Sequence, residues 1–141
     1  IKVALTSSSG ISAILIGGST IHSWSGIGYG KDNATDTINR WSNYTKRDVI
    51  NRLNSHDIIV IDEISMLSSD LLDLINNVFQ ILMGNKLPFG GKVIVFSGDV
   101  LQLPPVSKDV KIKYFFRSKI WKIIKKDKLK YIEFLVILSF L

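Results

Sequence analysis

A short β-branched run that ends in two acids constrains the fold more than any other feature of this sequence. Residues 58–61 are Ile-Ile-Val-Ile, and Asp62 and Glu63 follow directly. An uninterrupted run of this kind predicts a strand covered on both faces, as in the parallel sheets of α/β proteins. The two acids then lie at the carboxyl end of the strand, which is the edge of an open α/β sheet where ligands bind.

A second strand with a similar ending follows after a helix. Residues 93–96 form another apolar run that predicts a fully buried strand, and Ser-Gly-Asp follows at residues 97–99. A serine at residues 68–69 can cap the intervening helix, which Gly84 ends, and apolar residues repeat along it at helical spacing: Leu71, Leu72, Ile75, Val78, Phe79 and Leu82. This order predicts parallel strands with right-handed crossovers, so both acidic ends should project from one sheet edge.

The first strand is predicted at residues 3–5, and a polar loop comes after it. The loop offers hydroxyls and backbone amides at the start of a short helix, which is a natural cradle for a phosphate backbone: Thr6, Ser7, Ser8, Ser9 and Gly10. Thr20, His22 and Trp24 add donors and an aromatic face that can stack on a base. Packing inside the protein is the more common role for such a histidine and tryptophan, so that alternative stays open.

Residues 29–56 are polar and rich in Asn, Asp and Thr. We expect a mobile insertion here, with one short helix that carries Val49, Ile50 and Leu53 on one side.

The acidic strand ends suggest magnesium and water chemistry. Asp62 can coordinate Mg²⁺ directly or through water, because Mg²⁺ prefers hard oxygen ligands, and Glu63 can orient or deprotonate an attacking water. Asp99 lies at the second strand end, and Gln102 follows on a backbone stiffened by two prolines, where its amide can contact a terminal phosphate. The alternative is a set of exposed polar residues with no ligand.

The pattern G-x-x-x-x-G-K-[ST], which grips nucleotide phosphates, occurs nowhere in these 141 residues. The three glycines at residues 26–30 are spaced GxGxG rather than GxGxxG, so they do not indicate a dinucleotide site.

The charge is uneven along the chain. Residues 107–141 hold ten Lys or Arg and three acids, whereas the first 106 residues hold eight and nine. A basic tail is more often a solvated surface than a nucleic-acid site. There is no cysteine, which excludes disulfides and thiolate metal sites. The apolar residues 134–141 fall far short of the ~20 needed to span a bilayer, so we expect no membrane anchor.

Four segments together resemble, in order and spacing, successive motifs of PIF-type DNA helicases, relatives of bacterial RecD in helicase superfamily one. They are LTSSSGISAILIGGSTIHSWSGIG, IIVIDEISML, LPFGGKVIVFSGDVLQLPPV and FFRSKIW, and the match covers most of residues 1–122. The resemblance implies a RecA-like α/β motor domain, incomplete here, and an ATP-dependent 5′-to-3′ DNA helicase. Roles in DNA repair, recombination and telomere maintenance are implied as well.

By that resemblance, Asp62 and Glu63 are the metal-binding and water-activating acids of an ATPase site. Asp99 and Gln102 sense the γ-phosphate and couple it to DNA. Residues 6–10 and residues 20–23, which include Thr20, His22 and Ser23, contact single-stranded DNA. The cofactor is Mg²⁺ with ATP as substrate, and the location is intracellular, in the nucleus or mitochondrion of a eukaryote.

The ends depart from the family pattern. The phosphate-gripping loop should precede Ile1, and the arginine fingers and second motor domain should follow Leu141. Residues 123–141 form a basic and then apolar tail, with FLVILSFL where an aromatic-Arg-Gln segment is expected, so we expect truncation or a frame shift. A non-catalytic remnant that binds single-stranded DNA is the alternative function, and another kind of ATPase, such as a transporter or packaging motor, fits the motifs less well.

Overall fold

Four parallel strands form the central sheet of the computed structural model, which describes residues 1–28, 30–99 and 113–126. The strand order is β2-β1-β3-β4, with bounds β1 (Val3–Ser7), β2 (Ser19–Thr20), β3 (Ile58–Asp62) and β4 (Val93–Phe96). Ser7 of β1 is in register with Asp62 of β3, and Ile61 is in register with Phe96 of β4. The predicted parallel sheet is therefore confirmed, and the three main strands end at the same edge.

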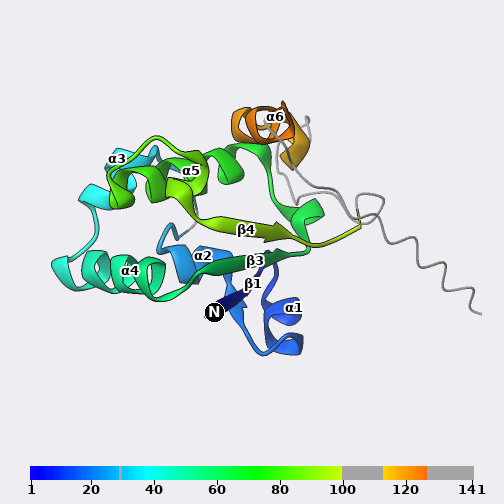
Figure 1. The fold of residues 1–141 in the computed structure, drawn as a ribbon, viewed down its shortest axis with the longest axis horizontal. Helices are drawn as coiled ribbons and strands as arrows, with labels where there is room; N and C mark the ends of the chain where they lie inside the picture. Colours follow the sequence, from blue (N-terminus) through cyan, green and yellow to red (C-terminus); the bar gives the residue numbers. More distant parts are fainter. Residues whose placement is uncertain (29, 100–112, 127–141) are drawn as a thin grey trace, which may run out of the picture.

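The helices follow the strands in the alternating order of an α/β protein (Figure 1). They are α1 (Gly10–Leu15), α2 (Ile21–Ser25), α3 (Ala34–Asn39), α4 (Asn43–Ser55), α5 (Ser69–Met83) and α6 (Lys119–Lys126), with short 3-10 turns η1 (Ile64–Met66), η2 (Pro88–Gly91) and η3 (Phe115–Arg117). The predicted helix between the acidic strand ends is confirmed as α5. Ser68 caps it by accepting a hydrogen bond from the Leu71 amide at 3.2 Å, and Gly84 ends it at φ 65°.

The core lies on one face of the sheet. Ile59 and Ile61 are fully buried together with apolar residues of α5: Leu72, Ile75, Val78 and Phe79. On the opposite face, Val3, Leu5, Val93 and Val95 are 42–57% exposed. The prediction that both runs are covered on two faces is therefore wrong within the described residues. Successive side chains of a strand point to opposite faces, and the described helices cover only one of them.

Residues 29–56 hold two helices rather than the single short one we expected. α3 and the longer α4 place four side chains in the core, at 6% exposure or less: Ala34, Ile38, Val49 and Leu53. Arg52 of α4 also donates a hydrogen bond from Nε to the Trp24 carbonyl at 2.9 Å. The segment is thus packed into the domain, which does not fit the expectation of a mobile insertion. Its polar composition reflects the exposed helix faces.

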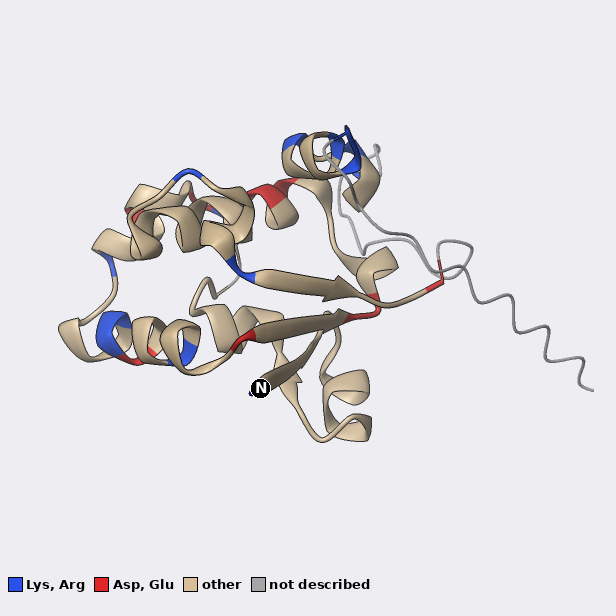
Figure 2. Cartoon of the chain, viewed as in Figure 1, with Lys and Arg blue, Asp and Glu red and all other residues tan. Residues whose placement is uncertain are grey.

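α6 begins before the predicted domain boundary at residue 122 and continues past it to Lys126. Ile120 of α6 is buried, and Lys and Arg cluster on the outside of this helix (Figure 2). The apolar end predicted at residues 134–141 lies outside the described residues. Across the ranges that the structure describes, no helix has the length and apolar character needed to cross a membrane.

Candidate ATPase and DNA site

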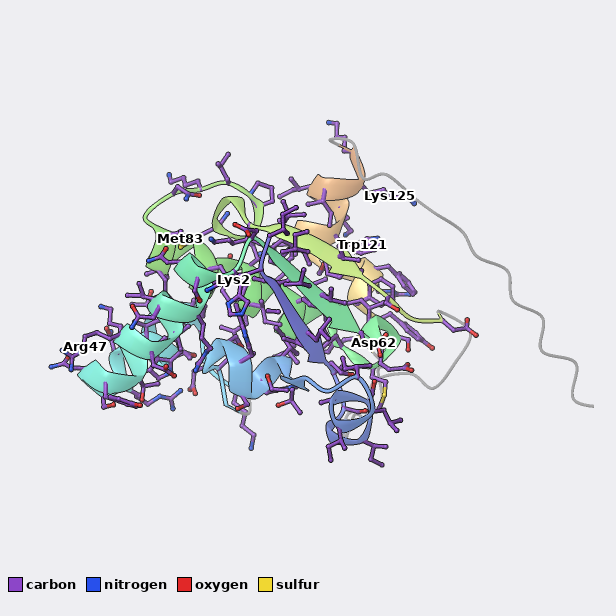
Figure 3. All side chains as sticks on the ribbon, turned by 60° about the horizontal axis from the view of Figure 1, so that its bottom comes forward. Lys2, Arg47, Asp62, Met83, Trp121 and Lys125 are labelled. Atoms are coloured by element: carbon purple, nitrogen blue, oxygen red, sulfur yellow. The ribbon has the colours of Figure 1, made fainter. Side chains whose placement is uncertain are left out.

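The predicted acid pair lies at the carboxyl end of β3, where Figure 3 labels Asp62. Asp62 is the last residue of the strand, and Glu63 adopts the left-handed conformation with φ 55° and ψ 44°. The following Ile64 amide donates a hydrogen bond to the Ser97 carbonyl at 3.0 Å, which ties the acid pair to the end of β4. A Cβ at Gly98 would lie 2.9 Å from the Ile64 nitrogen, so glycine is required for this close approach.

Asp99 directly follows Gly98 and is exposed at the same edge of the sheet. The structure therefore brings Asp62, Glu63 and Asp99 to one edge, as the strand order predicts. Gln102, the other residue assigned to phosphate sensing, lies outside the described residues, so its role stays a prediction.

The loop after β1 is hydrogen-bonded to the acid pair. The Ser8 amide donates to the Asp62 carbonyl at 3.1 Å, and the Ser8 hydroxyl donates to the Glu63 carbonyl at 2.6 Å. The Ser12 hydroxyl donates to Oδ2 of Asp62 at 2.8 Å. The loop and the helix that begins in it thus contact both the backbone and the carboxylate of the predicted ATPase residues.

The structure corrects the role of two predicted DNA-binding residues in this loop. Thr6 and Ser7 are fully buried, and the Thr6 hydroxyl donates to the Val60 carbonyl at 2.6 Å. Their hydroxyls are therefore used inside the sheet and do not form part of a phosphate cradle. Ser8 and Ser9 are partly exposed and Gly10 is exposed, so a contact between these three residues and DNA stays a prediction.

The second predicted DNA segment lines a hollow of about 590 Å³, which we call the His22 hollow. Its lining among the described residues includes Thr20, His22, Ser23, Gly26 and Gly28. The Thr20 hydroxyl accepts a hydrogen bond from the Ser23 amide at 3.2 Å and so caps α2. Burial lowers the pKa of His22 below its ordinary value of 6.5, because an imidazolium loses hydration there.

Trp24 does not supply the aromatic face that we considered for base stacking. It is 7% exposed, and its ring makes edge contacts with Phe79 at 6.1 Å and with His56 at 5.8 Å between ring centroids. The packing alternative is therefore correct for Trp24. Helical spacing decides this, because Ile21, Trp24 and Ser25 share the inner side of α2.

Next to the acid pair lies a second hollow of about 330 Å³, the acid hollow. Its lining includes Ser9, Ser12, Glu63, Ser65 and Met66. The Ser65 hydroxyl is buried and has no hydrogen-bond partner among the described residues. Sequence reasoning missed Ser12 and Ser65. The helix start was visible in the sequence, but the side of the helix that faces β3 was not.

The acids at the carboxyl edge of the sheet fit a magnesium ion whose other ligands are mainly water and phosphate oxygens. Among the described residues, no group of three His, Asp or Glu side chains could hold a metal ion. Mg²⁺ commonly binds one or two carboxylates and completes its shell with water and phosphate oxygens. Asp62, with the Ser12 hydroxyl on its Oδ2, supplies one hard carboxylate of the required kind.

A parallel sheet with helices in the crossovers and acids at its carboxyl edge defines an open α/β protein that binds its ligand at that edge. The model of the family described as PIF1-like helicase matches residues 1–135. The chain therefore belongs to the PIF1-like helicase family, as its motifs suggested.

Among its relatives are two Saccharomyces cerevisiae proteins. The chain is 43% identical over 123 residues to the ATP-dependent DNA helicase PIF1, and 37% identical over 124 residues to the ATP-dependent DNA helicase RRM3. Each alignment covers 86% of this chain but only 14% and 17% of the respective relative. The chain thus spans less than a fifth of these proteins.

Solved structures agree with the fold. The Pif1 helicase from Candida albicans superimposes with a TM-score of 0.77 at 38% identity, covering 86% of this chain and 27% of that one. The Bacteroides Pif1 helicase in complex with ADP-AlF3 and single-stranded DNA gives a TM-score of 0.71 at 32% identity, covering 84% and 29%. The RecA-like fold is therefore confirmed.

Proposed function

We propose that this chain supplies the metal and water half of the ATPase site, together with part of the DNA path, of an ATP-dependent DNA helicase. One observation carries the proposal. Ser8 and Ser12, which belong to the loop and helix assigned to DNA contact, donate hydrogen bonds to the backbone and carboxylate of Asp62 and to the Glu63 carbonyl. A shift of the loop on DNA would therefore move the acids directly.

Each acid has a separate task in this proposal. ATP bound with Mg²⁺ supplies the phosphoryl group that is transferred to water. Asp62 would hold the metal through its carboxylate, which the Ser12 hydroxyl orients by donating a hydrogen bond to Oδ2. Glu63 accepts a proton from the attacking water, so hydrolysis yields ADP and phosphate. Glu63 has a left-handed backbone conformation just after β3, and Glu63 lines the acid hollow.

DNA binding is proposed for two groups of residues at the surface. Ser8, Ser9 and Gly10 are partly or fully exposed, and the His22 hollow adds Thr20, His22 and Ser23. Family members have been solved with single-stranded DNA and with forked double-stranded DNA, which supports this partner class. Asp99 and Gln102 are proposed to sense the γ-phosphate and to couple hydrolysis to DNA.

We further propose 5′-to-3′ movement and a role in DNA repair, recombination and telomere maintenance. The site of action is intracellular, in the nucleus or mitochondrion if the organism is a eukaryote. These proposals rest on the family alone.

A chimeric motor tests the proposal. In it, residues 1–126 replace the matching segment of the Candida albicans Pif1 helicase. It should unwind duplexes that carry a 5′ single-stranded tail and not those with a 3′ tail. Asp62→Asn should raise the Mg²⁺ concentration needed for ATP hydrolysis, whereas Asp57→Asn, at the other end of β3, should not. Unchanged Mg²⁺ dependence in Asp62→Asn would remove the metal-binding role.

Gln102→Ala tests the coupling role in the same chimeric motor, whose transplanted segment includes residue 102. Its ATP hydrolysis should respond poorly to single-stranded DNA. Undiminished stimulation by DNA would argue against coupling through Gln102.

A further inference from the structure

α6 and the turn before it carry a group of cationic side chains that the ATPase and DNA site does not use. We define the basic face as five exposed residues: Arg117, Lys119, Lys122, Lys125 and Lys126. Residues 113–126 contain no acid. Figure 2 shows the Lys and Arg residues gathered on α6, whereas other parts of the structure mix both signs.

The basic face is not balanced by ion pairs of its own. None of its five side chains forms an ion pair within the described residues, where the three pairs that exist involve Arg40, Arg52 and Lys113. By comparison, Arg52 of α4 pairs with Asp48 of the same helix. A helix surface that is merely solvated usually intersperses charges of both signs, and this one does not.

The helix that carries these charges is firmly attached to the domain. Its first two amides, of Lys119 and Ile120, donate hydrogen bonds to the Asp73 carboxylate at 3.0 and 2.9 Å. Trp121 packs edge-on against Phe96 of β4, with ring centroids 5.4 Å apart. Figure 3 labels Trp121 close to the sheet and Lys125 farther from it. The cations are therefore presented on a fixed support, which lowers the entropy cost of binding a polyanion.

The spacing of the cations suits a chain of phosphates. Lys119, Lys122 and Lys126 fall on one side of the helix, at intervals of three and four residues. They span roughly 10 Å at about 1.5 Å per residue, while one nucleic-acid strand in a duplex presents a phosphate about every 3.4 Å along the axis. About three phosphates can therefore lie opposite these lysines.

We propose that the basic face is a second nucleic-acid contact that binds the phosphate backbone without reading sequence. The inference deepens the proposed function, on which it rests, because it adds a DNA-binding surface outside the loop after β1 and the His22 hollow. Its contacts are electrostatic, so they should release counterions and depend strongly on salt. The Trp121 ring packs edge-on against Phe96, so this ring is not part of the basic face.

The test measures binding of the 141-residue chain to a fluorescein-labelled double-stranded oligonucleotide by anisotropy, at several salt concentrations between about 50 and 200 mM. The variant Lys119→Gln/Lys122→Gln/Lys126→Gln removes three charges of the basic face. Lys31→Gln/Lys46→Gln/Arg47→Gln removes three exposed charges elsewhere and serves as the matched control. Circular dichroism checks that each variant keeps the wild-type fold.

We expect the basic-face variant to lose tenfold or more in affinity at 0.1 M salt, and its log–log salt slope to fall by about 2.7, or about 0.9 for each of three phosphates. The control should change the slope by well under 1. Equal losses of affinity in both variants would show that the effect depends only on the net charge of the chain, and this result would overturn the proposal. Unchanged binding in both would also overturn it, while leaving DNA binding at the other segments intact.

Two further outcomes separate this inference from the proposed function. Binding to anionic phospholipid vesicles but not to the oligonucleotide would overturn the choice of partner. Absence of any DNA binding by the wild-type chain would overturn the basic face as a DNA contact. The ATPase proposal is judged separately, by the Mg²⁺ dependence of Asp62→Asn in the chimeric motor.

Discussion

Replacing Glu63 with glycine should stabilise the chain even though it removes the proposed catalytic base. Glu63 has φ 55° and ψ 44°, a left-handed conformation that costs a residue with a Cβ roughly 1–2 kcal/mol. Its carboxylate forms no ion pair within the described residues, and the hydrogen bond from the Ser8 hydroxyl goes to the Glu63 backbone carbonyl, so truncation of the side chain loses little. Part of this gain is lost, because glycine gives the unfolded chain more conformational freedom, which lowers the free energy of unfolding by about 0.4–1 kcal/mol. The net gain should be about 0.5–1 kcal/mol.

Urea denaturation of the 141-residue chain measures this gain as a higher midpoint with an unchanged slope. Glu63→Ala is the matched control, because it removes the carboxylate but keeps the Cβ that causes the strain. The free energy of unfolding of the glycine variant should exceed that of the alanine variant by about 0.5–1 kcal/mol. At a relaxed position the order is reversed, since glycine is then less stable than alanine by roughly 0.5–1 kcal/mol. That reversed order would refute the strain at Glu63.

Three other perturbations follow from the same contacts. Burial lowers the pKa of His22 in the folded chain, so the unfolded chain takes up a proton first as the pH falls. The free energy of unfolding should therefore fall as the pH drops below 6.5. In a pH series, His22→Gln should weaken this pH dependence. Gly18→Ala should lower the free energy of unfolding by about 1–3 kcal/mol in urea denaturation, because the new Cβ would collide with a β1 carbonyl. Gly17→Ala is the control: a Cβ at Gly17 meets no atom within 4 Å, so only the strain of its positive φ should destabilise this variant. Ser12→Ala removes the hydrogen bond to Asp62 and should slow Mg²⁺-dependent ATP hydrolysis by the chimeric motor. Ser12→Thr keeps a hydroxyl and should restore part of the rate. Equal rates for Ser12→Ala and the unsubstituted motor would show that this hydrogen bond is dispensable.

The strand order and the acid edge could be predicted because β-branched runs and helical spacing are local signals. The register that sets Ser7 beside Asp62 follows from two parallel strands that end together. The exposed sheet face could not be predicted, because the runs at residues 58–61 and 93–96 are apolar at every position. Only the placement of the helices decides which alternate side chains are buried.

The finer features of the site depend on tertiary geometry. No local pattern marks Glu63 as left-handed, because glutamate has no preference for that conformation. The Ser12 hydroxyl meets Asp62 across fifty positions of sequence, which spacing alone does not reveal. In the same way, Thr6 and Ser7 look like a phosphate-binding loop in the sequence, but β1 extends to Ser7 and buries both.

The most direct test of the account is turnover by the chimeric motor with Glu63→Gln. The amide keeps the size and backbone strain of the side chain but cannot accept the proton from water. We predict that ATP and single-stranded DNA still bind with affinities close to those of the unsubstituted motor, while steady-state hydrolysis is lost. Asp57→Asn, at the amino end of the same strand, should leave hydrolysis unchanged. Normal turnover in Glu63→Gln would contradict the assignment of Glu63 as the water-activating acid and, with it, the proposed ATPase site.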